Sequence, residues 1–566
     1  MKLYRVLLFI LINSILSANA QPTVQPFPSP KQEIRAVWLA TIGGIDWPHS
    51  YQSEKQKEEL ITILDQLKRG GINTVLLQTR VRATTIYPSM YEPWDACITG
   101  KAGIFSKTDT KVQQGRIPSY DPLQFAIDEC HKRGMQLHAW VVTIPVGKWN
   151  SQATQMLRKK QPSLLKKIGD EAYMNPEQKE TADYLANICD EIISKYDVDG
   201  IHLDYIRYPE TWPKARKSVQ QSERRNQITK IVNRIYKSVK IRKPWVIVSC
   251  SPIGKHDDLS RYHSGGWNAR KAVSQDAQRW MKDGIMDALY PMMYFRDNNF
   301  FPFAIDWQEN NNGRWVVPGL GIYFLDSKEG RWSLNDVQRE MNVVRQLGMG
   351  HCYFRSKFFT DNTKGIYNFG ASFDATPALI PPMTWSNTIP PSAPTDLRIK
   401  NHILSWHEAK NNADSPNLLY NVYASQDFPV DTDNPENLIA TRIDATSIAV
   451  YDEQQNYAVT AQDRYGLEGP ATQLLLYAGT AIKATLICLT DGKPIELPKV
   501  PSTFDAQYLV IESLQGIQID ARPIPHKTMR LDVSRLPDGI YQIRYLGKKG
   551  KHHRCGFFAI KRKKDK

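Results

Sequence analysis

Eight short apolar runs between residues 33 and 378 constrain the fold of this 566-residue chain more than any other feature. Each run has the length of a strand, and helical patterns separate successive runs. Alternation of this kind is typical of a parallel sheet that is covered by helices. The expected strands are Arg35–Thr41, Thr74–Thr79, Gln136–Val142, Gly200–Asp204, Val246–Ser251, Ala288–Met293, Val316–Ile322 and His351–Arg355.

Glycines mark the expected ends of several helices. Arg69-Gly70-Gly71, Arg133-Gly134 and Leu347-Gly348 each precede an expected strand, and glycine adopts the left-handed C-cap conformation cheaply. The eight units predict an α/β fold, a (β/α)8 TIM barrel over 33–378. A doubly wound open sheet is the alternative. It is disfavoured because Gly43-Gly44, after the first strand, does not form the G-x-G-x-x-G phosphate loop.

The segments outside the barrel predict export and two further modules. Residues 1–20 have the charged start, apolar stretch and Ala18-Asn-Ala20 cleavage site of a secretory signal peptide, and an uncleaved N-terminal anchor is the alternative. No later segment is expected to span a membrane. The remaining divisions are a Pro-rich leader (21–32), a Pro-rich linker (379–391) and two small all-β sandwiches (392–477 and 480–561).

A second set of short strands fills the last module. We expect Met529–Val533 to pair with Gly539–Tyr545 through the turn Arg535-Leu-Pro-Asp-Gly539. The seven cysteines have no close spacing, which excludes a zinc knuckle or a CxxC redox motif, although Cys488 and Cys555 could pair. The His and Asp residues lack HxH or HExxH spacing, so neither a metal nor another cofactor is expected.

The chain carries a formal charge of +15, and removing Lys2 and Arg5 from that total leaves +13. This excess suits a polyanionic partner such as an anionic glycan, although it can also serve only as a solubilising surface. Nucleic acid is not expected, because a chain with a secretory start shows no recognition motif for it.

The segment Asp197–Pro209 contains the strongest functional signal. The apolar run Gly200–Leu203 leads to Asp204, and a charge at the end of a buried strand needs a partner or a function. In a barrel enzyme the catalytic groups lie at the C-terminal ends of the strands. We therefore expect Asp204 to be an ionised catalytic carboxylate, with Arg207 nearby to lower its pKa.

Glycoside hydrolysis also needs a protonated carboxyl group. Asp326 follows the seventh strand and is the first candidate for this proton donor, with Asp297, Glu210 and Asp46 as alternatives. Aromatic and polar side chains at the other strand ends suit the C–H faces and hydroxyl edges of a sugar. The expected substrate-binding residues are Arg80, His138, Trp140, His202, Arg207, Tyr294 and Tyr323, each of which could instead be a core or ion-pairing residue.

Four motifs resemble the glycosyl-hydrolase-like 10 family: Ile34–Ala40, Tyr87-Pro-Ser89, His138-Ala-Trp140 and Asp199–Pro209. The resemblance implies an exported bacterial glycosidase-type barrel over about 33–378, with its acid at Asp204. Many members carry a second acid where this chain has Tyr205, and Val-Arg-Pro is common where this chain has Thr79-Arg-Val-Arg.

The 389–477 region resembles a fibronectin type III domain through Pro391–Leu397, Leu404-Ser-Trp406 and Tyr457–Asp463. The last module is faintly similar to the C-terminal β-sandwiches of exported Bacteroidetes proteins, through Leu536–Tyr541.

These patterns together predict an exported glycoside hydrolase that cleaves a bacterial cell-envelope glycan, with peptidoglycan glycan strands as one candidate. Its partner would be a polymeric, anionic glycan, and its location the periplasm or outer surface of a Gram-negative-type bacterium. The alternative is a non-catalytic glycan-binding or envelope scaffold protein that retains the barrel groove.

Overall fold

The computed structural model describes residues 28–562, with gaps at 104–117, 214–217, 263–265, 453, 477–485, 498–499, 501–503, 514–517, 525–529 and 549–551. The expected signal peptide and the first part of the leader lie outside these residues. Within the described part of the chain, no helix is both long and apolar enough to cross a bilayer.

The central sheet is a closed parallel barrel of eight strand positions. Two positions are split into pairs of short strands, and Pro291 and Pro318 lie at the breaks, where proline offers no N–H for a strand pair. The last strand pairs with the first, Arg35 opposite His351, which closes the sheet. In barrel order the strands are β1 (Arg35–Leu39), β2 (Thr74–Arg80), β3 (Gln136–Val142), β7 (Gly200–Asp204), β8 (Ile247–Cys250), β9/β10 (Ala288–Leu289, Met292–Met293), β11/β12 (Trp315–Val316, Gly319–Leu320) and β13 (His351–Tyr353).

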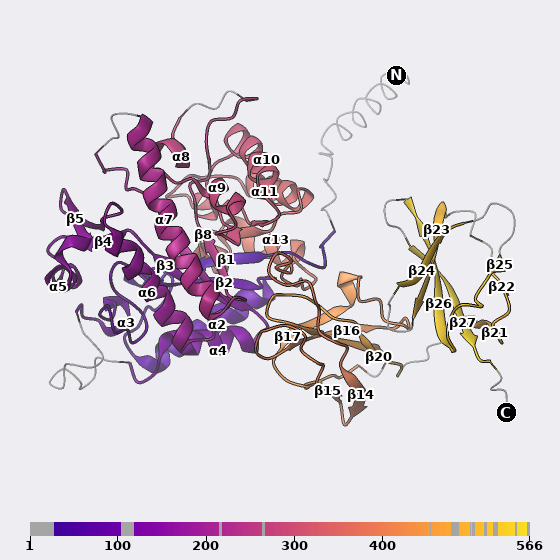
Figure 1. Cartoon of the computed structure of the whole chain (residues 1–566). Helices are drawn as coiled ribbons and strands as arrows, with labels where there is room; N and C mark the ends of the chain where they lie inside the picture. The colour runs from indigo at the N-terminus through magenta and orange to yellow at the C-terminus, as the bar shows by residue number, and fades with distance from the viewer. Residues whose placement is uncertain are drawn as a thin grey trace, which may run out of the picture.

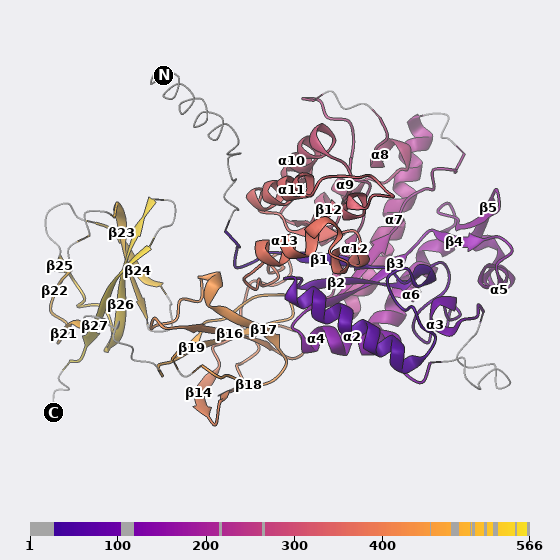
Figure 2. The ribbon, with the colours of Figure 1, turned by 180° about the vertical axis from the view of Figure 1, so that it is seen from behind.

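Helices surround this sheet (Figures 1 and 2). Asp121 caps one of them by accepting from the amides of Leu123 and Gln124, and Ser333 forms a capping box with Asp336. Gly71, Gly134 and Gly348 have positive φ at helix ends, as expected. The helices are α2 (Ser53–Arg69), α3 (Ala96–Thr99), α4 (Pro122–Lys132), α6 (Lys179–Lys195), α7 (Ser218–Arg242), α8 (Ala269–Ala272), α9 (Ala277–Lys282), α10 (Phe301–Glu309), α11 (Leu334–Gln346), α12 (Ser356–Thr360) and α13 (Ile366–Phe373).

The segment between β3 and α6, residues 145–174, is an insertion at the C-terminal end of the barrel strands. It contains β4 (Pro145–Lys148), α5 (Gln152–Lys160), β5 (Leu165–Ile168) and β6 (Glu171–Met174), and its strands form a small antiparallel sheet in the order β4-β6-β5. Figure 1 shows it on the side of the barrel away from β16 and β17.

Two small β domains follow the barrel. The first has a three-stranded sheet, β14-β15-β18, and a four-stranded sheet, β17-β16-β19-β20. Its likeness to a fibronectin type III domain stays a prediction. The strands are β14 (Thr395–Lys400), β15 (Ile403–His407), β16 (Leu419–Ser425), β17 (Leu438–Ile443), β18 (Ser447–Ala449), β19 (Asn456–Gln462) and β20 (Thr472–Leu474).

The second β domain has a five-stranded sheet, β21-β27-β26-β23-β24, and a short pair, β22-β25. The pairing expected within 529–545 is wrong: β25 pairs with β22, whereas β26 pairs with β23 and β27. Cys555 is a free thiol, and the side chain of Cys488 lies outside the described part of the structure. The strands are β21 (Leu486–Thr490), β22 (Ile495–Glu496), β23 (Ala506–Ser513), β24 (Gln518–Pro523), β25 (Arg530–Leu531), β26 (Gly539–Gly547) and β27 (His552–Ile560).

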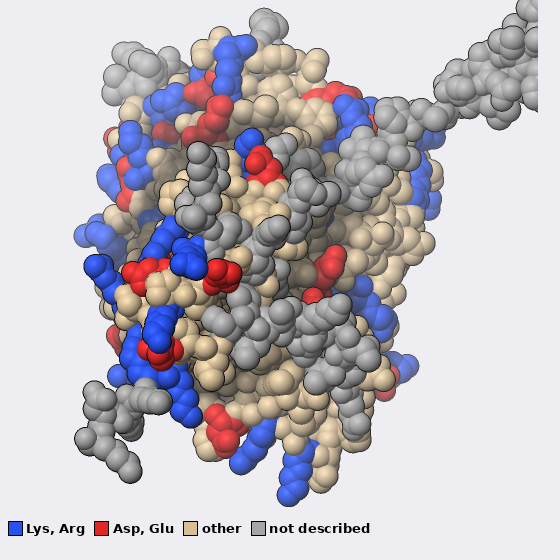
Figure 3. Space-filling view, turned by 90° about the vertical axis from the view of Figure 1, so that its right-hand side faces the viewer, with Lys and Arg blue, Asp and Glu red and all other residues tan. Residues whose placement is uncertain are grey.

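Two basic residues near the C-terminus have acidic partners among the described residues. Arg562 pairs with Asp538 and Lys548 with Asp505. On the face that carries this domain, Lys and Arg side chains lie among Asp and Glu (Figure 3). Among the described residues, charges of both signs are therefore mixed on this face.

The first β domain packs against the N-terminal end of the barrel strands. Asp199, directly before β7, accepts hydrogen bonds from His131 (2.8 Å) and from Arg442 of β17 (2.5 Å). A side chain at Gly134 would meet the carbonyl oxygen of Thr441. Burial alone would raise the pKa of Asp199, but the charges of Arg442, His131 and Arg464 hold it well below its usual range.

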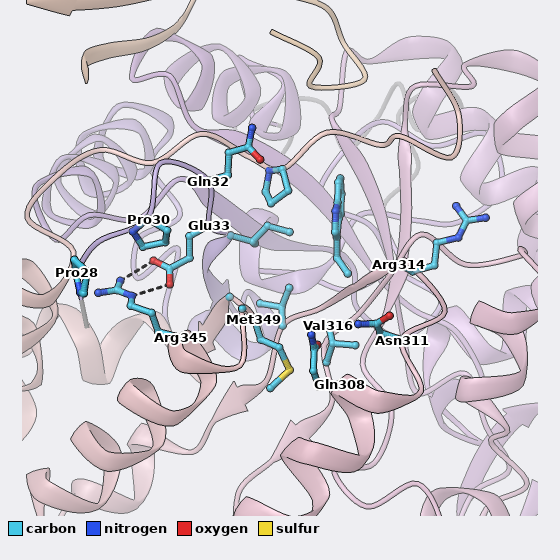
Figure 4. A pocket seen from close by; sticks show the side chains of 16 residues that line it. Pro28, Pro30, Gln32, Glu33, Gln308, Asn311, Arg314, Val316, Arg345 and Met349 are labelled. Carbon is cyan, nitrogen blue, oxygen red and sulfur yellow. Dashed lines mark hydrogen bonds and ion pairs between the residues drawn. The ribbon is translucent and has the colours of Figure 1, made fainter. Parts of the chain in front are cut away.

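The N-terminal end also contains a cavity of about 270 Å³ (Figure 4). Ile34, Val316 and Gly350, which line it, stand at the start of barrel strands rather than at their ends. Barrel enzymes place their sites at the opposite end. This cavity is therefore not a candidate for the active site.

We predict that Arg442→Ala destabilises the protein by about 3 kcal/mol, because it leaves the buried Asp199 carboxylate with fewer partners. Thermal melting measures the effect. Arg398→Ala is the matched control, because Arg398 is 63% exposed in its ion pair with Asp396, and exposed pairs contribute about 0–1 kcal/mol. Equal effects of the two substitutions would contradict a stabilising role for the Asp199–Arg442 contact.

The same carboxylate predicts a pH dependence. Since the folded pKa of Asp199 is depressed, its contribution is complete above the unfolded pKa of about 3.9 and is lost as the pH falls toward the folded value. We expect Asp199→Asn to lower the melting temperature at pH 7 and to differ less from wild type below about pH 4. A difference that stays constant from pH 7 to pH 3 would refute this linkage.

Candidate active site

Three neighbouring strands bring hydrogen-bond donors to Asp204, the last residue of β7. Its carboxylate accepts from the Trp140 indole on β3 (3.0 Å), the Ser251 hydroxyl just after β8 (2.7 Å) and the Tyr205 amide (2.7 Å). Three donors aimed at one carboxylate stabilise its negative charge and fix its orientation. The structure therefore holds the Asp204 carboxylate in a fixed orientation at the barrel's C-terminal end.

Tyr205 has a backbone conformation that is rare for a residue with a side chain. Its φ is +54°, in the left-handed region, which costs a non-glycine residue about 1–2 kcal/mol. Such strain is found preferentially at functional sites. It follows Asp204 directly and accompanies the bend of the chain after β7.

Arg207 does not pair with Asp204, contrary to the expectation from sequence. Its guanidinium binds Glu210 at 2.8 Å and lies 3.8 Å from the Tyr205 ring centre. The Tyr205 hydroxyl also donates to Glu210. Burial raises the pKa of Glu210, but the hydrogen bonds and charge of Arg207 outweigh burial and lower it. Glu210 is therefore held ionised, which is unfavourable for a proton donor.

Tyr294 and Tyr323 lie in an aromatic cluster with Phe354 and Trp38. The ring centre of Tyr294 lies 5.7 Å from the ring centre of Tyr323 and 5.1 Å from that of Phe354. The Tyr294 hydroxyl is buried and has no hydrogen-bond partner among the described residues. Burial raises its pKa well above the usual range, and the charge of Asp204 contributes. Burial likewise raises the pKa of Tyr323, to about 12. Tyr294 therefore presents an unpaired donor near Asp204.

His138 and His202 lie inside the barrel below Asp204 and are 1% and 0% exposed. The Trp38 indole donates to His202 Nε2 (3.2 Å), and His202 Nδ1 contacts the Ser249 hydroxyl (3.0 Å). Burial lowers the pKa of His138 to about 4 and that of His202 well below its usual range. Both are neutral interior residues, which corrects their assignment to substrate binding.

Arg80 is also a structural residue. It is fully buried, pairs with Glu92 at 2.7 Å and donates to the carbonyl oxygens of Val142 and Thr143. It cannot reach a substrate in this arrangement. Trp140 is 5% exposed, and its indole binds Asp204 instead of offering a free ring face.

The second carboxyl group is less clearly placed. Asp326 follows a short 3-10 helix, Ile322–Leu325, and accepts from the Lys328 amide at 2.8 Å. Asp46 is buried against Arg355 and Ser356, and Asp297 pairs with Arg339. Across the described ranges, no hydrogen bond joins any of these groups to Asp204. The assignment of Asp326 as proton donor stays a prediction.

Among the described residues, one group with the side chains of a metal site occurs, at the N-terminal end of the barrel strands. Glu33, His351 and Asp374 come together and are buried. Arg35 and Arg345 lie among them: Arg345 is 2.6 Å from both acids, and Arg35 is 2.7 Å from Glu33. Two cations already compensate the two acids, so this cluster suits an ion-pair network rather than a cation.

Comparison with known proteins assigns the chain to a family. The model of the family described as "Glycosyl hydrolase-like 10" matches residues 33–324. The chain belongs to the glycosyl hydrolase-like 10 family. The match contains β1 to β12, and hence Asp204 and its three donors.

Curated relatives of this glycosyl hydrolase-like 10 chain include Glycosyl hydrolase YngK of Bacillus subtilis, 28% identical over 400 residues, covering 64% of this chain and 76% of the relative. Glycosyl hydrolase DigH of Escherichia coli is 30% identical over 303 residues, covering 47% and 66%. Among solved structures, the glycoside hydrolase domain of PgaB (BpsB) from Bordetella bronchiseptica is 12% identical with a TM-score of 0.42, covering 60% of this chain and 98% of that domain.

We predict that Gly200→Ala destabilises this glycosyl hydrolase-like 10 barrel by about 1–3 kcal/mol, because a new Cβ would lie 2.6 Å from the buried His138 ring. Chemical unfolding measures the loss. Gly539→Ala is the control, because the nearest atom to its Cβ would lie at an ordinary 3.5 Å. An unchanged Gly200→Ala protein would show that His138 can move freely.

Proposed function

We propose that this chain is an exported glycoside hydrolase that cleaves a bacterial cell-envelope glycan, with peptidoglycan glycan strands as the leading candidate. The observation that carries the proposal is the Asp204 carboxylate, held by Trp140, Ser251 and the Tyr205 amide. Family membership and the printed names of the two curated relatives support hydrolase chemistry.

In the proposed reaction Asp204 acts as nucleophile or as general base. The ionised carboxylate would attack the anomeric carbon, or would remove a proton from the attacking water. The unpaired Tyr294 hydroxyl would donate a hydrogen bond to the sugar. Asp326 is the proposed proton donor to the leaving oxygen, because it follows the seventh strand position at the same end of the barrel.

Export to the periplasm or outer surface of a Gram-negative-type bacterium is part of the same proposal. It is supported by the signal-peptide pattern of residues 1–20. The positive charge of the chain supports a polymeric, anionic glycan as substrate.

Asp204→Asn should lower the release of reducing ends from glycan strands of purified sacculi by about 10²–10⁴-fold, because the amide cannot serve as nucleophile or base. The thermal melt should fall only slightly, because the amide oxygen can keep the bonds from Ser251 and the Tyr205 amide and only the Trp140 bond is lost. Asp258→Asn, in a loop after β8, is the matched carboxylate control.

Two outcomes would contradict this assignment. Full activity of Asp204→Asn would remove Asp204 from the reaction. A wild-type protein that releases no ends but loses retention on sacculi after Asp204→Asn would support a non-catalytic glycan-binding protein instead.

Tyr294→Phe tests the unpaired hydroxyl. We expect kcat to fall by about 10-fold or more, because one positioned donor near the reacting centre is lost, while stability changes little or rises, since a buried unpaired hydroxyl is removed. Tyr236→Phe is the control, because its hydroxyl contacts Asp287 at the N-terminal end of the barrel. Equal kcat values for both variants would refute a catalytic role for Tyr294.

A further inference from the structure

The insertion of residues 145–174 borders the candidate active site. It begins directly after β3, where both the amide and the hydroxyl of Thr143 bind the carbonyl oxygen of Asp204 at 2.9 Å. On its far side, Lys166 Nζ lies 4.5 Å from the ring centre of Trp212, in the segment that follows β7. The insertion therefore lies along the chain segment that leaves Asp204.

This insertion is strongly basic. It contains Lys148, Arg158, Lys159, Lys160, Lys166 and Lys167 against only Asp170 and Glu171. Arg82, which is exposed after β2, lies 3.9 Å from the position of a Cβ at Gly147 and adds to the positive charge. The charge excess of the chain is thus high beside the barrel's C-terminal end.

Three of these cations, Arg158, Lys166 and Lys167, form what we call the cationic strip. Aromatic rings hold them: Arg158 lies 4.3 Å and Lys167 5.8 Å from the ring centre of Trp149, and Lys166 lies over Trp212. No ion pair joins any of the three to an acid in the described part of the chain. By contrast, Lys148 pairs with Glu171 at 2.8 Å.

Whether a cation is held by a ring or by a carboxylate decides how much of its positive charge remains available to a ligand. A ring face orders a cation and reduces the entropy lost on binding, but it leaves the full positive charge available. A carboxylate would cancel that charge. The cations also lie against Trp149 and Trp212, and Trp212 is 4% exposed, so the Trp212 ring is poorly placed to stack on a sugar.

We propose that the cationic strip binds anionic substituents of a polysaccharide that extends from the Asp204 site along the insertion. This inference rests on the proposed function and assigns it a recognition surface. A membrane surface is the competing partner for a basic patch. It is disfavoured because no exposed large apolar side chain occurs among residues 145–174, whereas lasting membrane attachment requires an apolar anchor in addition to charge.

The test uses the full chain and its Arg158→Gln/Lys166→Gln/Lys167→Gln variant. The control is Lys230→Gln/Lys237→Gln/Lys282→Gln, which removes the same charge from exposed positions on α7 and α9. Affinity electrophoresis in gels containing polygalacturonate, dextran sulfate or neutral hydroxyethylcellulose measures binding. Thermal melts establish that all proteins are folded.

We expect the strip variant to bind at least one anionic polymer about tenfold more weakly than wild type, from three contacts of about 0.5 kcal/mol each. The control should stay within about twofold, and salt should weaken wild-type binding. Preferential loss on polygalacturonate indicates carboxylates, and preferential loss on dextran sulfate indicates sulfate-like groups. Equal losses in both variants, or none in the strip variant, would overturn the proposal.

Two further measurements separate this proposal from neighbouring ones. Asp204→Asn should bind polygalacturonate like wild type. Failure of the proposed catalytic role of Asp204 and failure of the proposed binding by the strip can therefore be distinguished. If the strip variant loses binding to phosphatidylglycerol vesicles but keeps its affinity for both polymers, the strip is a membrane contact and the polysaccharide proposal is wrong.

Discussion

Pairing of the first barrel strand with the last is the constraint on which the remaining structure depends. Register contacts join Arg35 to His351 and Val37 to Tyr353, more than 300 positions apart in the chain. A buried network of Glu33, Arg35, Arg345 and Asp374 surrounds this closure. Because each buried cation there has an acid partner, losing one member would leave an uncompensated charge. Closure in turn brings eight strand ends to one face, which is what allows residues far apart in sequence to share a site.

Strand β7 then connects the two ends of the molecule. Asp199 stands before it and binds Arg442 of the first β domain, whereas Asp204 ends it and receives the donors of the candidate site. The first β domain is therefore not a spacer that hangs from the barrel. Its Arg442 forms a buried ion pair with Asp199 of the barrel, and its Tyr465 joins the interior apolar cluster together with Ile380 and Met383. The first β domain thus lies at the end of the barrel opposite to Asp204.

The fold could be predicted from sequence because it depends on patterns that span only a few residues. Apolar runs, helix caps and glycines at Gly71, Gly134 and Gly348 all act within a few residues. The site was harder to predict. Asp204 was identified because a charge interrupts a buried run, but the partners of Arg80, His138 and His202 depend on strand register and burial, which no local pattern contains. Arg207 is instructive, because Glu210 stands only three residues away and could have been recognised as its partner. Trp140 was named for sugar contact, yet the parallel register of β3 and β7 makes it a support for Asp204.

The cations of the described residues differ in their partners. Some pair with acids, whereas others lie against aromatic rings. At the N-terminal end, Arg442, Arg464, Arg35 and Arg345 pair with acids, and in the second β domain Arg562 and Lys548 have acidic partners. At the insertion, ring faces replace carboxylates as the partners of Arg158, Lys166 and Lys167. A cation ordered by a ring keeps its charge and loses little further entropy when an anion arrives. Uncompensated charge of the described residues therefore lies on the insertion near Asp204, and it would attract an anionic ligand to this end of the barrel.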